Sequence, residues 1–149
     1  MEFDKLIADF GTRHKVESLV AVDDAAALDI DGIIVTMVAK GDVLTISAEI
    51  GEPPAEGASA FADLLLEANM QSGMFFAKAP RAGAYIAVQR LSLLLVDDDS
   101  FDAALESFVN QAETWQRLLS DFRPVAKAAA EHAKSEGSPS FGSSGFMQV

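Results

Sequence analysis

The sequence predicts an α+β protein in which an antiparallel β-sheet is flanked by helices, in the order α-β-β-β-α-β-β-α. The strand-like segments between residues 20 and 50 are joined by turns of about two residues. Such turns are too short for parallel crossovers, so we expect antiparallel pairing. Apolar residues recur at helical spacing at the start of the chain, in its middle and over residues 101–122. Helices are therefore expected at these three places.

The first helix is expected over residues 2–13. Its apolar residues lie at positions i, i+3, i+4 and i+7, which places them on one stripe of the helix. Gly11 is expected to help end it. The stripe consists of Phe3, Leu6, Ile7 and Phe10.

A three-stranded meander is expected within residues 20–50, with strands over 25–31, 33–40 and 43–50. Asp31-Gly32 and Gly41-Asp42 supply the turns, since these residue types tolerate positive φ. The third strand alternates between apolar and polar residues, as expected for a sheet with one solvated face. The middle strand is apolar on both faces, so it needs cover on both sides, and a partner can provide the second cover.

A second helix is expected over residues 59–70, after the sheet-breaking residues 51–54. It is apolar around much of its circumference, which favours burial in the core or in a dimer interface. Asn69 stands where a C-terminal cap is expected. Strands over 74–78 and 84–95 follow, and a long helix capped by Asp99 or Ser100 is expected to reach Phe122.

The chain is expected to form one domain over residues 1–122, followed by a tail over residues 123–149. The tail is alanine-rich and then rich in glycine and serine, so we expect it to be partly disordered. The net charge of the chain is −12, and the first 122 residues hold 8 of its 11 basic and 21 of its 23 acidic side chains. This acidity argues against nucleic-acid binding and favours solubility and basic partners.

No pattern in the sequence predicts catalysis or a cofactor. Asp97-Asp98-Asp99 lacks the spacing of a calcium loop and is better interpreted as the start of a helix. His14 and His132 have no triad partners nearby, and the glycines form no phosphate-binding motif. The chain has no cysteine, and its apolar runs are too short to span a membrane. We therefore expect a cytoplasmic protein that is not an enzyme and holds no metal.

The order of elements resembles that of the class I type III secretion chaperones, the Tir-chaperone (CesT-like) family. The resemblance covers roughly residues 3–122. Three segments carry it: Phe-Asp-Lys-Leu-Ile at 3–7, Leu-Leu-Leu-Glu-Ala-Asn at 64–69 and Ala-Glu-Thr-Trp-Gln-Arg-Leu-Leu at 112–119.

The resemblance implies a homodimeric chaperone that binds the N-terminal region of a secreted effector in extended form and keeps it soluble and competent for export. It implies no cofactor. By position, the partner-binding residues would be Phe3, Leu6, Ile7, Phe10, Val35, Met37 and Ile46. The dimer interface would draw on Leu65, Met70, Phe76 and Ile86.

Two other functions are compatible with the sequence. One is a protein-binding module of related fold that acts outside secretion. The other is a domain that binds a small molecule or lipid in the same apolar region.

Overall fold

The computed structural model describes residues 1–71, 73–81 and 83–123. Within them, the predicted arrangement of an antiparallel sheet flanked by helices is confirmed, with one additional short strand. The helices are α1 (Phe3–His14), α2 (Ala58–Gln71) and α3 (Asp98–Ser120). The strands are β1 (Val20–Val22), β2 (Ala25–Ile30), β3 (Ile33–Lys40), β4 (Val43–Gly51), β5 (Phe75–Lys78) and β6 (Tyr85–Ser92).

The strands form one antiparallel sheet in the order β1-β2-β3-β4-β6-β5. Strand β1 is the element missing from the predicted order. It has three residues, all exposed, and is too short for apolar alternation to identify it. The turn at Asp31-Gly32 is confirmed, because both residues have positive φ and Ile30 pairs with Ile33.

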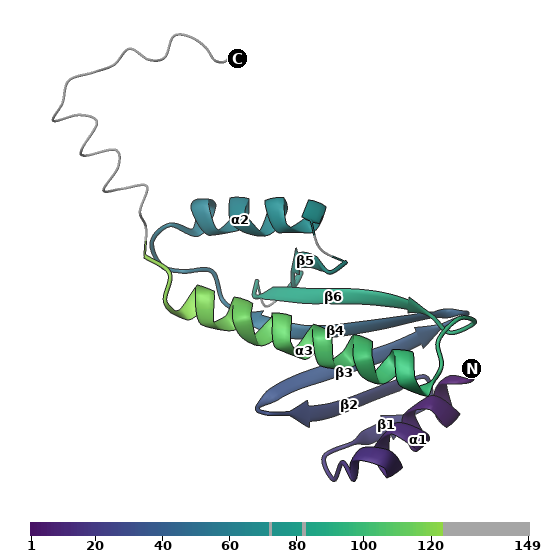
Figure 1. The fold of residues 1–149 in the computed structure, drawn as a ribbon. Coiled ribbons are helices and arrows are strands. Elements are labelled where there is room, and N and C mark those ends of the chain that lie inside the picture. Colours follow the sequence, from purple (N-terminus) through teal and green to yellow (C-terminus); the bar gives the residue numbers. More distant parts are fainter. Residues whose placement is uncertain (72, 82, 124–149) are drawn as a thin grey trace, which may run out of the picture.

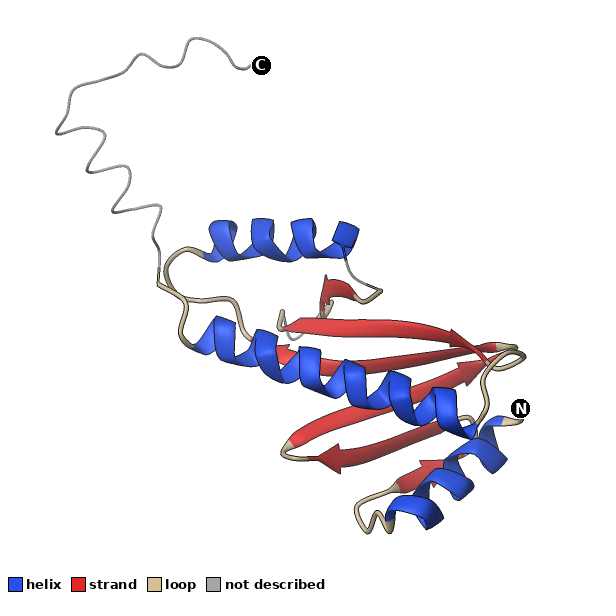
Figure 2. Ribbon diagram, viewed as in Figure 1, coloured by secondary structure: helices blue, strands red, loops and turns tan. Residues whose placement is uncertain are grey.

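The inner face of the sheet is the one that α3 crosses (Figures 1 and 2). It carries side chains that are fully buried in the core, including Val35, Met37, Leu44 and Ile46. The outer face is the opposite one, and there Ile34 and Val38 are 57% and 45% exposed. Strand β3 is therefore apolar on both faces, as predicted, but the described residues bury only one of them.

The three consecutive aspartates begin α3, as the sequence indicates, but the cap is Asp97 rather than Asp99 or Ser100. The Asp97 carboxylate accepts a hydrogen bond from the backbone N–H of Ser100 at 2.8 Å, and the Asp97 N–H donates to the Ser100 hydroxyl at 2.9 Å. This reciprocal pair is a capping box. The backbone hydrogen bond from Ser100 lowers the pKa of the Asp97 carboxyl.

A polar cluster ties the end of α1 to the start of α3. Arg13 lies 2.5 Å from one carboxylate oxygen of Asp102 and 3.1 Å from Asp98. His14 lies 2.8 Å from the second Asp102 oxygen. Burial raises the pKa of Asp102, but the hydrogen bonds from Arg13 and His14 outweigh burial and leave this pKa below its ordinary value. The cluster holds α1 beside the edge of the sheet.

Helix α2 packs through Phe61 and Leu65, which are buried. The Phe61 ring lies 5.2 Å from that of Phe122 and 6.1 Å from that of Trp115, so α2 meets the end of α3. Asn69 is not a C-terminal cap, because α2 continues to Gln71. Beyond Arg123, the predicted tail over residues 123–149 lies outside the described residues.

Candidate protein-binding surface

The edge of the sheet at β5 is closed by a side chain of α2. The Asn69 side chain donates to the carbonyl oxygen of Phe76 at 3.2 Å and accepts from the N–H of the same residue at 2.7 Å. Both backbone groups of Phe76 are therefore satisfied by one amide, which mimics a neighbouring strand. An edge protected in this way offers less main chain to an incoming strand.

The opposite edge, at β1, is open within the described residues. Strand β1 pairs only with β2, and Val20 and Val22 are 63% and 65% exposed. Val22 and Ala25 flank a two-residue turn, so we expect them to form a hydrogen-bonded pair. Because such pairs alternate along an antiparallel ladder, the N–H and carbonyl of Ala21 are expected to point away from β2, toward the open edge.

An apolar groove lies between the open edge and α1, which run side by side in Figure 1. We call it the β1 groove. Its volume is about 300 Å³, and it is lined by Phe3, Asp4, Ile7, Ala8, Leu19 and Ala21. A sheet edge beside an apolar groove can bind an extended peptide, since the main chain pairs with the edge while alternate side chains enter the groove.

Further hollows lie at the other end of α1. One has a volume of about 390 Å³ between α1 and α3, and its apolar lining includes Phe10, Ile30 and Leu105. A neighbouring hollow of about 600 Å³ shares Phe10 and Ile30 and extends over the loop after α1. Helix α1 is thus flanked along its length by open apolar depressions.

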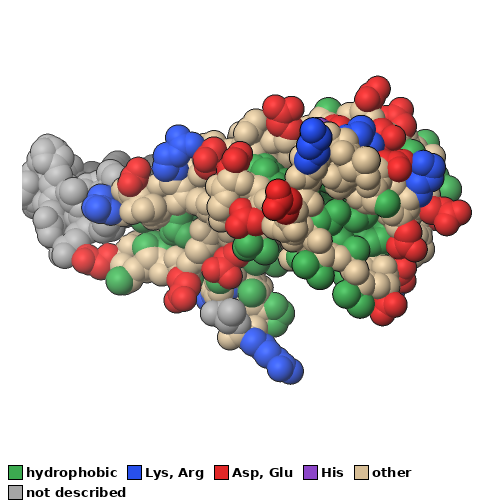
Figure 3. Space-filling view, turned by 90° about the horizontal axis from the view of Figure 1, so that it is seen from below, with side chains coloured by type: hydrophobic (Ala, Val, Ile, Leu, Met, Phe, Trp, Pro, Cys, Tyr) green, Lys and Arg blue, Asp and Glu red, His purple; other side chains and the backbone are tan. Residues whose placement is uncertain are grey.

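The outer face continues the apolar surface beyond the open edge. Its exposed apolar side chains come from four strands: Val20, Val22, Ile34, Val38, Val43 and Phe75. Figure 3 shows the molecule from below the view of Figure 1, and on this side hydrophobic side chains gather into patches with acidic side chains between and around them. The acidic surroundings oppose nonspecific association of these patches.

The structure separates the seven residues predicted to bind a partner into two groups. Phe3, Ile7 and Phe10 are nearly buried but line the hollows beside α1. The other four are fully buried in the core: Leu6, Val35, Met37 and Ile46. For all seven, partner binding stays a prediction. The exposed β1 residues were not predicted to bind a partner, because their only indication in the sequence is the short alternation Val-Ala-Val.

The residues predicted at a dimer interface also differ in exposure. Leu65 and Phe76 are buried, Ile86 is half-buried and Met70 is 89% exposed. Leu66, one helical turn before Met70, is 63% exposed. Residues four apart lie on one helix face, so α2 presents an apolar pair to solvent next to β5.

Neither a metal site nor a membrane span is found in the part of the chain that the structure describes. No group of three or more acidic, histidine or cysteine side chains there is arranged to hold a metal ion. None of the described helices is sufficiently long and apolar to cross a bilayer.

Solved structures share this fold. One is a chain in the crystal structure of the ExsC–ExsE complex, with a TM-score of 0.67, 22% identity, and 78% of this chain and 92% of that chain covered. A second is in the HopA1–SchA chaperone–effector complex, with a TM-score of 0.65, 14% identity, and 77% and 93% covered. A third is YbjN from E. coli, described as a putative transcription regulator, with a TM-score of 0.54, 19% identity, and 87% and 94% covered.

No curated protein matches the sequence. The sequence does match the Tir chaperone protein (CesT) family over residues 5–116, a span that runs from α1 into the second half of α3. This span includes the open edge, the Asn69 contact with β5 and the lining of the β1 groove except Phe3 and Asp4. By this match over most of its length, the chain belongs to the Tir chaperone protein (CesT) family.

Proposed function

We propose that this protein is a type III secretion chaperone that binds the N-terminal region of a secreted effector in extended form and keeps it soluble and competent for export. The observation that carries the proposal is the open edge at β1 beside the apolar β1 groove. Family membership supports it, as does the similarity to chaperones in chaperone–effector complexes.

The bound segment adds to β1 as a further strand. Its backbone pairs with the outward groups of Ala21, and its alternate side chains enter the β1 groove against Phe3, Ile7 and Leu19. Burial of these apolar side chains contributes about 25 cal/mol per Å², offset by the cost of ordering the segment. A segment held in this way stays extended in the cytoplasm and does not aggregate. The activity is binding alone, with no catalytic step.

Hydrogen exchange on a complex tests this assignment. The full chain is co-expressed with a secreted protein encoded beside its gene, and exchange is compared between the free chain and the purified complex. We expect slower exchange at residues 19–22, because their outward amides become hydrogen-bonded. Residues 75–78 on the closed edge serve as the internal control. Protection at 75–78 without protection at 19–22 would assign the effector to another surface.

We propose further that two copies of the chain associate through α2 and the adjacent strands. The exposed pair Leu66 and Met70 forms the contact, and the half-buried Ile86 lies on the outer face of the sheet nearby. Leu65 and Phe76 support this surface from inside the protomer. The double variant Leu66→Glu/Met70→Glu is expected to sediment as a monomer where the wild type sediments as a dimer.

Leu118→Glu is the matched control for the dimer, since Leu118 is an apolar residue, 50% exposed, on α3 and is not one of the two residues of the proposed α2 contact. It should leave the sedimentation coefficient unchanged. An unchanged dimer in the α2 double variant would show that the copies meet elsewhere. Circular dichroism establishes that each variant is folded.

A protein-binding role outside secretion is the second candidate, since the fold also occurs in YbjN, whose description does not mention secretion. The family match to Tir chaperones argues for the secretion role. A lipid-binding role is less compatible with the geometry, because the hollows beside α1 are open to solvent. Native mass spectrometry of the purified protein separates the lipid-binding role from the two protein-binding roles, since a lipid adds a small mass and a polypeptide a large one.

A further inference from the structure

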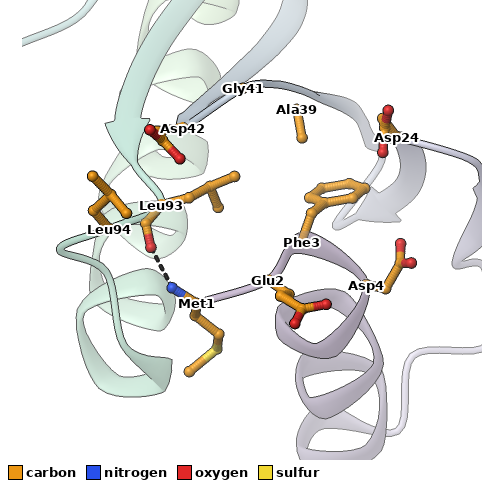
Figure 4. A pocket seen from close by; sticks show the side chains of 10 residues that line it. All are labelled: Met1, Glu2, Phe3, Asp4, Asp24, Ala39, Gly41, Asp42, Leu93 and Leu94. Carbon is orange, nitrogen blue, oxygen red and sulfur yellow. Dashed lines mark hydrogen bonds between the residues drawn. The ribbon is translucent and has the colours of Figure 1, made fainter.

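Another hollow lies at the N-terminal end of α1, between that helix and the turn from β6 into α3 (Figure 4). We call it the N-terminal hollow. Its volume is about 470 Å³, and it is lined by Met1, Glu2, Phe3, Asp4, Asp24, Ala39, Gly41, Asp42, Leu93 and Leu94. The backbone nitrogen of Met1 donates to the carbonyl oxygen of Leu93, which fixes the start of the chain against this turn.

The lining combines apolar groups with a ring of carboxylates. Phe3, Ala39 and Leu93 provide the apolar part, and in Figure 4 the Phe3 ring lies between Ala39 and the α1 backbone. Four carboxylates surround it, from α1 and its first residues and from two turns of the sheet: Glu2, Asp4, Asp24 and Asp42. Within the described residues, none of these four carboxylates forms an ion pair with a cationic side chain.

The carboxylates are spread around the rim and are not gathered on one point. No three of the described acidic side chains are arranged to hold a metal ion. A dispersed rim of negative charge suits long, flexible cationic side chains, whose stems can cover apolar surface while their charged ends reach the rim. The chemistry of the hollow therefore selects lysine or arginine beside an apolar residue.

Two observations connect this hollow with a bound chain. It shares Phe3 and Asp4 with the β1 groove, so the two form one continuous track along the N-terminal half of α1. At its other side, Leu94 and Leu95 are 72% and 85% exposed, although both are large apolar residues. An exposed leucine pair next to an apolar hollow marks a contact surface.

We infer that the N-terminal hollow binds a basic, apolar segment of the same polypeptide that adds to β1. An apolar side chain of that segment rests on Phe3 and Leu94, and flanking lysine or arginine side chains pair with the carboxylates of Glu2, Asp24 and Asp42. The inference rests on the proposed function, since it extends the path of the bound polypeptide beyond the β1 groove. It adds a charge requirement that the β1 groove by itself does not impose.

Peptide selection tests this requirement without knowledge of the natural partner. Random 15-residue peptides displayed on phage are selected on the immobilised full chain and on the variant Glu2→Gln/Asp24→Asn/Asp42→Asn. Asp4 is kept, because it lies in the first turn of α1 and stabilises the helix dipole. The control Glu52→Gln/Asp63→Asn/Glu113→Gln removes the same charge from exposed positions outside the hollows.

The wild type and the control are expected to select peptides with alternating apolar residues next to lysine or arginine, and the hollow variant to lose the basic preference. A selected peptide, synthesised and measured by fluorescence anisotropy, should bind the hollow variant about tenfold more weakly than the control, the effect of several partly exposed ion pairs. Added salt should narrow this difference.

Two other outcomes overturn the inference in distinguishable ways. If alternating apolar peptides are selected with no basic preference, or if both variants lose affinity equally, the hollow has no charge-specific role and the β1 assignment survives. If selected peptides bind a chain carrying Ala21→Pro as tightly as the wild type, the bound strand does not lie at β1, and the proposed binding site and this extension both fail.

Discussion

The two edges of the sheet differ in whether their outward backbone groups have hydrogen-bond partners. At β5, the Asn69 amide pairs with both backbone groups of Phe76. At β1, three exposed residues end the sheet beside an apolar groove, and no described element covers them. An unprotected edge in a soluble protein invites pairing with another chain. The difference indicates that the molecule blocks one edge and leaves the other available to a partner.

The closed edge also explains a feature of the sequence. Asn69 ends the leucine-rich segment 64–69, which is part of the resemblance to the Tir chaperones. Its position in the last turn of α2 brings its side chain to β5, seven residues along the chain. Leu65 of the same segment is buried against the core. The same short segment thus supplies both a residue that packs α2 against the core and the residue that protects the edge.

Ala21→Pro should have the largest effect on the open edge. Proline removes the outward N–H of β1, and its ring fills part of the groove. We expect partner affinity to fall at least about tenfold, from the lost hydrogen bond and displaced side chains. Thermal stability should change little, since the residues of β1 are exposed. Isothermal titration with a bound peptide and a melting curve measure the two quantities.

Ala21→Ser is the matched control, because it keeps the amide and the size of the side chain. It should bind like the wild type. Equal affinity for the proline and serine variants would show that the main chain of β1 takes no part in binding.

Asn69→Ala, at the closed edge, should have the opposite effects: lower stability and unchanged partner affinity. It leaves the N–H and carbonyl of Phe76 without their partner, which is expected to reduce the free energy of unfolding by about 1–3 kcal/mol. Partner affinity should be unchanged, since β1 is at the far side of the sheet. Urea unfolding measures the first effect. Asn110→Ala, at an exposed position of α3, should stay within about 0.5 kcal/mol of the wild type.

Asp102→Asn should have the smallest effect, and it tests how α1 is held beside the open edge. Losing the pairs with Arg13 and His14 is expected to lower Tm by about 2 °C at neutral pH. The folded-state pKa of Asp102 lies below its ordinary value of 3.8, so its contribution is complete above that pH and is lost as the pH falls through the folded pKa. The Tm difference between wild type and variant should therefore close in acid. A difference that persists well below pH 3.8 would contradict this account.

The inner core and the element order follow from local pattern. The spacing of Phe3, Leu6, Ile7 and Phe10 identified α1, and Asp31-Gly32 located a turn, because helical and strand periodicities are properties of neighbouring residues. The bounds of β3 agree with the predicted 33–40, and its two apolar faces were evident from alternation alone.

The sequence by itself determined that this is an acidic α+β protein with an apolar surplus, and the order of its elements carried its family. Only the tertiary structure decided which apolar residues are surplus. Val35 and Ile34 are equally apolar neighbours, yet α3 buries the first and leaves the second exposed. Which face a helix covers, which edge an asparagine reaches and where two hollows meet at Phe3 all depend on contacts between distant segments. Periodicity shows which residues share a face of the sheet, and packing decides whether that face is buried or exposed.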